Sequence, residues 1–151
     1  MSSLRLRTVI DASPEACFEL SLSVDAHTSS MRASGERIVD GVRSGVMALG
    51  DTVTWRARHF GVPWTMTSKI TEYERPTMFV DEQVRGPFRS WHHRHLFRPF
   101  DGGTEMIDEV QLRSPLGILG RFADRAVVRH YLHGLLKTRN EWLRQELQRS
   151  A

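Results

Sequence analysis

Between Gly35 and Leu112 the sequence is a succession of short strand-like segments, with turn residues between them and no helix-like stretch. Six such segments can be distinguished. Strands joined by connections this short run antiparallel, because a parallel connection needs about a dozen residues or more. The region therefore predicts an antiparallel sheet. The breaks are Gly45–Asp51, Gly61-Val62-Pro63, Glu74-Arg75-Pro76, Gly86-Pro87 and Asp101-Gly102-Gly103.

The two ends of the chain predict the remaining elements. Apolar and polar residues alternate from Leu4 to Ile10, which is typical of a first strand. Ser13-Pro14-Glu15 combines an N-cap serine, a proline at the first helical position and an acidic residue near the positive end of the helix dipole. A short helix is expected to begin there, and a second one to span Val24 to Met31. The chain is then compatible with one long helix from about Leu119 to Gln148. This order of elements predicts the α+β class.

Composition narrows the class of protein. The chain has 151 residues, 40% hydrophobic and 26% charged, which fits one globular domain over residues 1–151. The net charge of +3 is small, so no nucleic acid is expected as a partner. Cys17 is the only cysteine, which excludes an intrachain disulfide and favours a reducing cytoplasm. No apolar run approaches the ~20 residues of a membrane helix, and the N-terminus lacks the apolar stretch of a signal peptide.

The step Asp101-Gly102 sets the register of one hairpin, because a type I′ turn needs two residues that tolerate positive φ. If Phe100 pairs with Gly103, one face of the hairpin carries two pairs of opposite charge and is expected to be solvated. The other face is mostly apolar and aromatic and is expected to be buried. The pairs on the buried face are Phe97 with Met106, His95 with Asp108, His93 with Val110 and Trp91 with Leu112.

The predicted buried face places a carboxylate opposite an imidazole. A buried carboxylate is costly unless it has a partner, and cross-strand Cβ separations of about 4.5–5.5 Å bring His95 within reach of Asp108. Asp108 would then fix the tautomer of His95 or hold the ring as an imidazolium. The pair is either a satisfied contact in the core or a ligand-contacting pair in a cavity. A third alternative is a metal site, in which His93 and His95 supply two imidazoles and Asp108 or His59 adds the third ligand. A two-histidine spacing recurs by chance, so no metal is assigned.

The neighbouring strands supply further candidates. Trp55 and His59 share one strand face, and Met66 lies on the apolar face of the next strand. For the segment Met78–Arg85 the pattern does not decide whether the odd-numbered or the even-numbered residues point inward. The odd-numbered face carries Phe79, Asp81 and Gln83.

The long C-terminal helix is predicted to carry two different stripes. The stripe expected to pack inward consists of Val127, Tyr131, Leu135, Thr138 and Trp142. The second stripe is basic and consists of Arg121, Arg125, Arg129, His133 and Lys137. A charged stripe is usually a solvated helix surface. The alternative is a docking face, either for transient contact with an acidic membrane surface or for an acidic partner protein.

Four segments resemble a known family: residues 79–88, 91–95, 102–108 and 114–120 are similar to the bacterial polyketide cyclase/dehydrase-like branch of the START-like (SRPBCC) superfamily. The order of elements is the helix-grip order of that superfamily, which also holds birch-pollen allergen relatives and coenzyme Q-binding proteins. The resemblance implies a curved antiparallel sheet wrapped around a long C-terminal helix, with two short helices after the first strand.

The resemblance also implies an apolar cavity between the sheet and the long helix. By resemblance, the cavity is lined from the sheet by Trp91, His93, His95 and Asp108, and from the helix by Tyr131 and Leu135. It favours the odd-numbered face of the segment Met78–Arg85 as the inward one. The superfamily holds carriers, sensors, cyclases and hydrolases on one scaffold, so the resemblance implies the fold more firmly than the activity.

Two functions fit these expectations. The first is binding of a hydrophobic or amphipathic small molecule, such as a lipid, a quinone or a polyketide-like aromatic compound. The alternative is a cyclase or dehydratase in which His95, polarised by Asp108, takes a proton beside a carbonyl and His93 or His59 returns one. No glycine-rich phosphate loop occurs, so no nucleotide cofactor is expected. The candidate ligand-binding residues are Trp55, His59, Met66, Phe79, Asp81, Gln83, Trp91, His93, His95, Phe97, Met106, Asp108, Val127, Tyr131 and Leu135.

Overall fold

The computed structural model describes residues 2–59, 61–113 and 127–149. Strand β1 (Ser2–Ile10) leads into α1 (Pro14–Leu22), α2 (Val24–Ser30) and the 3-10 turn η1 (Arg32–Ser34). The strands that follow are β2 (Arg37–Gly41), β3 (Thr52–His59), β4 (Val62–Glu74), β5 (Met78–Arg85), β6 (Ser90–Phe100) and β7 (Gly103–Arg113). The chain ends in the long helix α4 (Arg129–Arg149), and the earlier part of the predicted helix lies mostly outside the described residues. The predicted α+β class and the order of these elements are confirmed.

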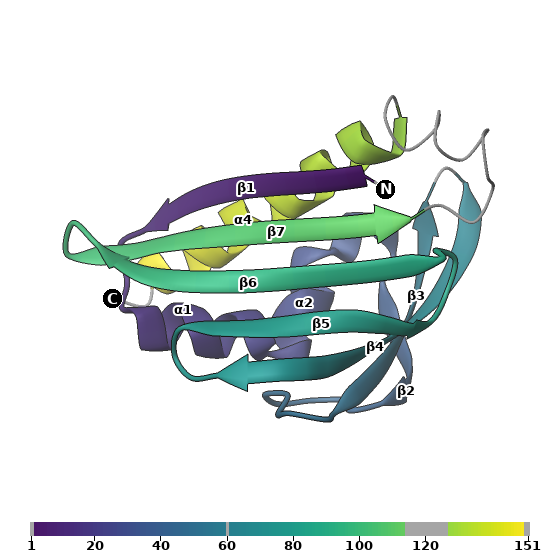
Figure 1. The fold of residues 1–151 in the computed structure, drawn as a ribbon, viewed down its shortest axis with the longest axis horizontal. Coiled ribbons are helices and arrows are strands. Elements are labelled where there is room, and N and C mark those ends of the chain that lie inside the picture. The colour runs from purple at the N-terminus through teal and green to yellow at the C-terminus, as the bar shows by residue number, and fades with distance from the viewer. Residues whose placement is uncertain (1, 60, 114–126, 150–151) are drawn as a thin grey trace.

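The strands form one antiparallel sheet in the order β1-β7-β6-β5-β4-β3-β2. In Figure 1 the helices lie behind the sheet, which curves around them. Helix α4 packs against β1, and both α1 and α2 contact α4. The concave face of the sheet therefore meets three helices, and the space between them is where a cavity can form.

The β6–β7 hairpin has the register expected from the sequence. Asp101 and Gly102 adopt φ angles of 51° and 83°, as a type I′ turn requires. The inward pairs are Phe97 with Met106, His95 with Asp108, His93 with Val110 and Trp91 with Leu112. His95 is 2% and Asp108 0% exposed, whereas Arg94 on the opposite face is exposed. Both the register and the assignment of the two faces are confirmed.

An apolar core fills one end of the concave face, beneath α1. The Ser13 side chain caps α1 by accepting a hydrogen bond from the N–H of Ala16. Phe18 on this helix makes edge-to-face contacts with Phe79 and with Phe97, at ring-centroid distances of 5.6 and 5.5 Å. The core cluster also contains Ile10, Cys17, Leu22 and Met106.

Strand β5 turns its odd-numbered face inward. Phe79 is 2% exposed and packs in the core, and Asp81 follows on the same face. Val80 on the opposite face is also fully buried, as is Ile107 on the outer face of β7. Because β5 buries apolar residues on both faces, its hydrophobic pattern alone could not show which face points inward.

The inward face of α4 differs from the predicted stripe. Its buried residues are Leu136, Arg139, Asn140 and Leu143. Val127 and Thr138, both predicted to point inward, are exposed, and the exposed fraction of Val127 is 53%. Counting apolar residues favours the predicted stripe, but the helix instead buries Arg139 and Asn140, two polar residues that bind a buried carboxylate on the sheet.

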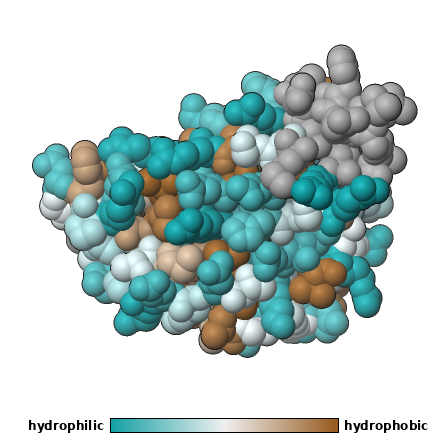
Figure 2. Space-filling model, viewed as in Figure 1, coloured by the Kyte–Doolittle hydropathy of each residue, from teal (hydrophilic) through white to brown (hydrophobic). Residues whose placement is uncertain are grey.

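The outer surface is largely polar on the face shown in Figure 2, where hydrophobic residues form separate small patches. On the predicted basic stripe, Arg129 and Lys137 are exposed and His133 is half-buried. The other two members, Arg121 and Arg125, lie outside the described residues. Among residues 2–59, 61–113 and 127–149, no helix is both long and apolar enough to cross a membrane.

Candidate functional site

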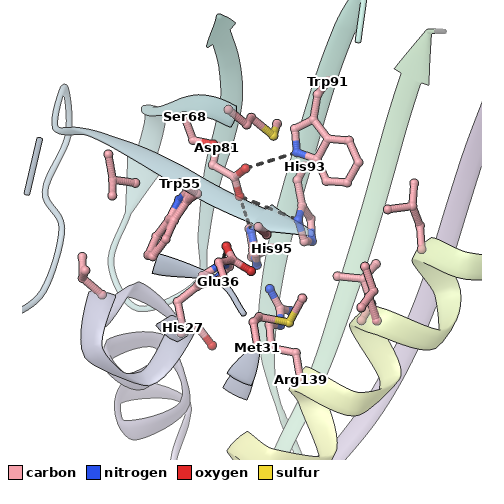
Figure 3. Close-up of a pocket in the computed structure, with 18 of the residues that line it drawn as sticks. His27, Met31, Glu36, Trp55, Ser68, Asp81, Trp91, His93, His95 and Arg139 are labelled. Carbon is pink, nitrogen blue, oxygen red and sulfur yellow. Dashed lines mark hydrogen bonds and ion pairs between the residues drawn. The ribbon is translucent and has the colours of Figure 1, made fainter. Parts of the chain in front are cut away.

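A pocket of about 340 Å³ lies between the concave face of the sheet, α2 and α4. Most of its wall is apolar, and three of the four tryptophans of the chain, Trp55, Trp64 and Trp91, contribute to it. Figure 3 shows that the polar side chains of Asp81, His93 and His95 gather on one side of this space, on the sheet. The pocket therefore combines apolar walls with one concentrated polar region.

Most of the predicted ligand-binding residues line the pocket. Those that line it are Trp55, His59, Met66, Phe79, Asp81, Trp91, His93, His95, Tyr131 and Leu135. The predicted residues that are not among its lining residues are Gln83, Phe97, Met106, Asp108 and Val127. Four of the five residues outside the lining lie on strands, so the direction of a strand side chain does not by itself place it at the pocket.

The residues outside the lining have other structural roles. Gln83 donates a hydrogen bond to the carbonyl of Phe88 at 2.7 Å and accepts one from its N–H at 3.1 Å, so it braces the β5–β6 turn. Phe97 and Met106 belong to the core cluster. Val127 is exposed at the start of the last helical region. Alternation gives the face of a strand residue but not its distance from the pocket.

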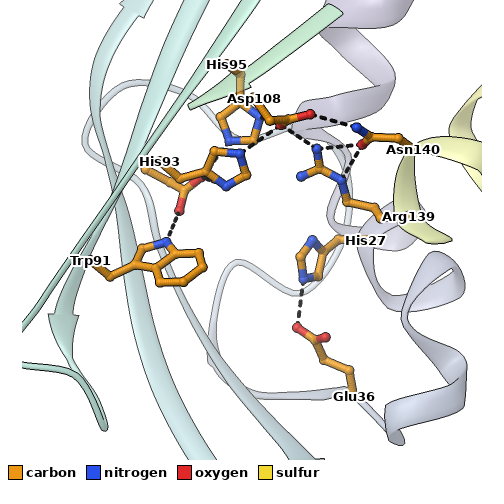
Figure 4. Close-up of polar contacts among 9 residues, drawn as sticks. His27, Glu36, Trp91, His93, His95, Asp108, Arg139 and Asn140 are labelled. Atoms are coloured by element: carbon orange, nitrogen blue, oxygen red, sulfur yellow. Dashed lines mark hydrogen bonds and ion pairs between the residues drawn. The ribbon is translucent and has the colours of Figure 1, made fainter. Parts of the chain in front are cut away.

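Asp108 lies behind the pocket wall and accepts three short hydrogen bonds (Figure 4). Its Oδ1 accepts from His93 Nε2 and from Arg139 Nη2, and its Oδ2 accepts from Asn140 Nδ2, each at 2.7 Å. The prediction that His95 is its hydrogen-bond partner is wrong. His95 Nδ1 lies 3.4 Å from Asp108 Oδ1 but makes no hydrogen bond. The partner is instead the diagonal neighbour, which lies within reach of a long side chain.

His95 binds a different carboxylate, that of Asp81 on β5. His95 Nε2 donates to Asp81 Oδ2 at 2.7 Å, and His93 Nδ1 lies 3.7 Å from the same oxygen. Trp91 Nε1 donates to Asp81 Oδ1 at 3.3 Å. The rings of His93 and His95 are stacked, with centroids 3.7 Å apart, and Phe79 stacks on His95 at 4.0 Å. Two carboxylates therefore enclose a stacked pair of imidazoles.

Burial and charge act in opposite directions on these groups. Burial, together with the nearby charge of His93, lowers the pKa of His95 to about 4, so desolvation outweighs the attraction of Asp81. Burial raises the pKa of Asp81, but the hydrogen bond from His95 and the surrounding positive charges lower it overall to about 2. Burial likewise opposes ionisation of Asp108, yet the charge of Arg139 holds its pKa well below the usual range. At neutral pH both carboxylates are ionised and His95 is neutral.

Two further histidines, each hydrogen-bonded to another side chain, lie on the pocket wall away from this cluster. His27 Nε2 is 2.7 Å from Glu36 Oε1, and the His27 ring packs against Trp55 with a centroid distance of 4.2 Å. His59 Nδ1 is 2.8 Å from the hydroxyl of Tyr131 on α4. Burial lowers the pKa of His59, and the charge of Glu36 opposes this only in part. These contacts connect the β3 side of the pocket with α2 and α4.

Sequence reasoning missed several of these polar residues. A buried carboxylate such as Asp108 requires a counter-charge, and Arg139 lies four residues after Leu135 on the same side of the predicted helix. This spacing could have indicated Arg139 as the counter-charge of Asp108. The contact between His27 and Glu36 joins two residues that the pattern leaves unrelated, so no comparable indication existed for this pair.

The comparison with protein families decides the classification. Residues 1–148 match the family described as polyketide cyclase/dehydrase and lipid transport. The chain belongs to this family. The resemblance seen in the sequence is thereby confirmed for nearly the whole chain. No curated protein matches the sequence.

Solved structures of low sequence identity share the fold. A protein from Thermus thermophilus is 16% identical, with a TM-score of 0.73 and coverage of 94% of this chain and 97% of the other. A protein from Rhodobacter sphaeroides is 17% identical, with a TM-score of 0.74 and coverage of 99% and 94%. The major latex-like protein 151 of Panax ginseng is 12% identical, with a TM-score of 0.71 and coverage of 97% of both chains. Identities this low establish the fold alone.

Proposed function

We propose that the chain binds one hydrophobic or amphipathic small molecule, such as a lipid, a quinone or a polyketide-like aromatic compound, in the pocket between the sheet, α2 and α4. The observation that carries this proposal is the pocket of about 340 Å³ with largely apolar walls and a few polar groups on one side. Small-molecule sites commonly have volumes of roughly 300–1,000 Å³ and this distribution of polarity. The family of the chain, which includes lipid-transport proteins, supports the same function.

The residues divide the work of binding by their chemistry. Trp55, Trp64 and Trp91 offer flat apolar surfaces that suit a ring system or an acyl chain. Asp81 and Arg139 offer charged groups at the cluster end of the pocket. An amphipathic ligand would therefore place its polar group near the cluster and its apolar part against the tryptophans.

A second candidate function is a cyclase or dehydratase acting on a similar compound. It is favoured by His95, which is neutral at neutral pH and whose Nδ1 makes no hydrogen bond. Against it, a base whose pKa is about 4 is weak, since general bases work best when their pKa lies near the working pH. Binding without chemistry is therefore the better supported function.

The experiment is native mass spectrometry of protein purified from cells under mild conditions, followed by extraction and identification of the bound molecule. We expect one apolar compound per chain. The variant Ser68→Phe places an aromatic ring in the pocket and should lose this compound. Thr65→Phe is the matched control, because Thr65 lies on the same strand but is exposed on the opposite face. Equal loading of both variants would contradict binding in this pocket.

The same preparation separates binding from catalysis. If the extracted compound is returned to the protein and recovered with an unchanged mass, the chain is a binding protein. Loss of water or formation of a ring in the recovered compound, abolished in His95→Gln, would support the enzyme instead.

We further propose that the chain works in the cytoplasm, and the contact of its basic stripe with a membrane surface stays a prediction.

A further inference from the structure

The two stacked histidines each turn one ring nitrogen toward Asp108 and the other toward Asp81 (Figures 3 and 4). Toward Asp108 Oδ1 they turn His93 Nε2 at 2.7 Å and His95 Nδ1 at 3.4 Å. Toward Asp81 Oδ2 they turn His93 Nδ1 at 3.7 Å and His95 Nε2 at 2.7 Å. Asp108 therefore faces one nitrogen of each ring, and Asp81 faces the other nitrogen of each ring.

This arrangement brings three potential metal ligands together. One ligand atom each from Asp81, His93 and His95 lies within 4.8 Å of the other two. Two atoms bound to one tetrahedral ion at about 2.0–2.2 Å lie roughly 3.3–3.6 Å apart. The separations of Asp81 Oδ2 from the two histidine nitrogens, 2.7 and 3.7 Å, lie on either side of that range. An ion would replace the hydrogen bond between His95 Nε2 and Asp81 Oδ2, and the two stacked rings would turn so that both nitrogen lone pairs point at it.

The hydrogen bonds around the two histidines resemble those around metal-binding histidines. Metal-binding histidines usually donate their second N–H to a carboxylate, which fixes the ring orientation and the tautomer. Asp108 already accepts this bond from His93 and is itself fixed by Arg139 and Asn140. Asp81 is held through its other oxygen by Trp91 Nε1. The three ligand groups therefore sit on supported side chains, two of them on the same strand.

One atom of the cluster has no partner without an ion. His95 Nδ1 is buried and makes no hydrogen bond within the described part of the chain, because the ring proton is used on Nε2 toward Asp81. If Nε2 binds an ion, the proton moves to Nδ1, where it faces Asp108 Oδ1 at 3.4 Å. Metal binding would thus turn the unpaired nitrogen into a donor that faces a carboxylate, and the proton stays on the ring.

From this geometry we propose that Asp81, His93 and His95 bind one divalent transition-metal ion, with Asp108 as the outer carboxylate of both histidines. Two imidazoles and one carboxylate suit Zn²⁺, Fe²⁺ or Co²⁺ better than Mg²⁺ or Ca²⁺, which prefer oxygen ligands. All three ligand residues line the pocket, so an ion held by them would border the space in which, by the proposed function, the small molecule binds. An oxygen atom of that molecule is the natural fourth ligand.

The test uses protein without a histidine tag, stripped with a chelator and titrated with Co²⁺ in the absence of any small-molecule ligand. We expect one equivalent of Co²⁺ to bind and to give visible absorption bands of a four- or five-coordinate ion. Asp81→Asn keeps the size of the side chain but removes the anionic ligand, and it should weaken Co²⁺ binding at least tenfold. His92→Gln is the matched control, because His92 lies on the same strand as the two histidine ligands but on its opposite face and does not line the pocket, and it should bind as the wild type does.

Thermal unfolding with and without Zn²⁺ supplies the second readout. The wild type and His92→Gln should gain melting temperature on addition of one equivalent of Zn²⁺, and Asp81→Asn should not. If Asp81→Asn fails to fold, His93→Gln takes its place in both measurements. The proposal would be overturned if the wild type did not bind the ion stoichiometrically. It would also be overturned if the Asp81 or the His93 variant bound the ion as tightly as the wild type does. Neither result would bear on binding of a hydrophobic molecule, which native mass spectrometry tests separately.

Discussion

The concave face of the sheet carries two buried regions of opposite character. Beneath α1, Phe18, Phe79 and Phe97 pack edge to face or stacked, in a core without charges. Further along the same strands, Asp108 lies beside the stacked histidines and binds Arg139 of α4. The first region gains free energy simply by leaving water, whereas the second must recover a large desolvation cost through pairing.

The difference indicates where the fold is stabilised and where function resides. Replacing a buried ion pair by apolar residues of similar size is often neutral or stabilising, so a charged cluster is poorly explained by stability alone. The cluster borders the pocket, and the aromatic core supports the strands from which Asp81, His93 and His95 project. We therefore expect the two regions to respond differently to substitution.

The largest effect is expected in the aromatic core. Phe18→Ala removes a ring that is 0% exposed and should lower the free energy of unfolding by about 3–5 kcal/mol. Ligand affinity of the remaining folded protein should stay unchanged, because Phe18 does not line the pocket. Urea unfolding and ligand titration measure the two quantities. A large loss of affinity at unchanged stability would mean that the two regions are not separate.

In the polar cluster, breaking the ion pair should cost more than removing it. Arg139→Met leaves Asp108 buried without its charge partner and should lower the free energy of unfolding by about 3–4 kcal/mol. The double variant Arg139→Met with Asp108→Asn removes both charges and should recover part of that loss. Urea unfolding of the two single variants and the double variant measures the coupling. Additive losses would show that the two side chains do not depend on each other.

The cluster should also make stability depend on pH, measured on chelator-treated protein. The pKa of His95 is about 4 in the folded chain and ordinarily 6.5, so only the unfolded chain takes up this proton between those values. The free energy of unfolding should therefore fall as pH decreases from 6.5 to 4, by up to about 3 kcal/mol. His95→Gln should flatten this part of the profile. An equally steep profile in the variant would assign the pH dependence to other groups.

The smallest effect is expected on the outer face of the same hairpin. Arg98 donates to Glu105 at 2.8 Å, and its side chain is 61% exposed. Arg98→Ala should change the free energy of unfolding by less than about 1 kcal/mol, because solvent and salt screen exposed pairs. Urea unfolding at low and high salt checks this. A loss as large as that of Arg139→Met would remove the contrast between exposed and buried pairs.

Sequence reasoning was reliable where covalent geometry determines direction. The turn at Asp101-Gly102 allows few alternatives, and alternation then fixes the face of every residue in β6 and β7. The candidate site followed from this register, as did the burial of His93, His95 and Asp108.

Where direction depends on tertiary packing, the sequence was less informative. The predicted inward stripe of α4 is rotated slightly from the observed buried face. A polar residue such as Arg139 can occupy a buried helix face when a partner on the sheet offsets its desolvation cost. The partners of His95 and Asp108 were likewise not determined by register, since diagonal neighbours compete with directly opposite ones. These contacts depend on how α4 docks on the sheet and on the position of β5.

The central claim, that the pocket binds a hydrophobic small molecule, is most directly tested by tryptophan fluorescence. Three of the four tryptophans line the pocket, so a fluorescent apolar probe such as anilinonaphthalene sulfonate should quench them by energy transfer when it binds there. We predict saturable 1:1 quenching of delipidated wild type and Thr65→Phe, and affinity at least tenfold weaker in Ser68→Phe. Equal titration curves for Ser68→Phe and Thr65→Phe, or no saturable quenching of the wild type, would contradict the account.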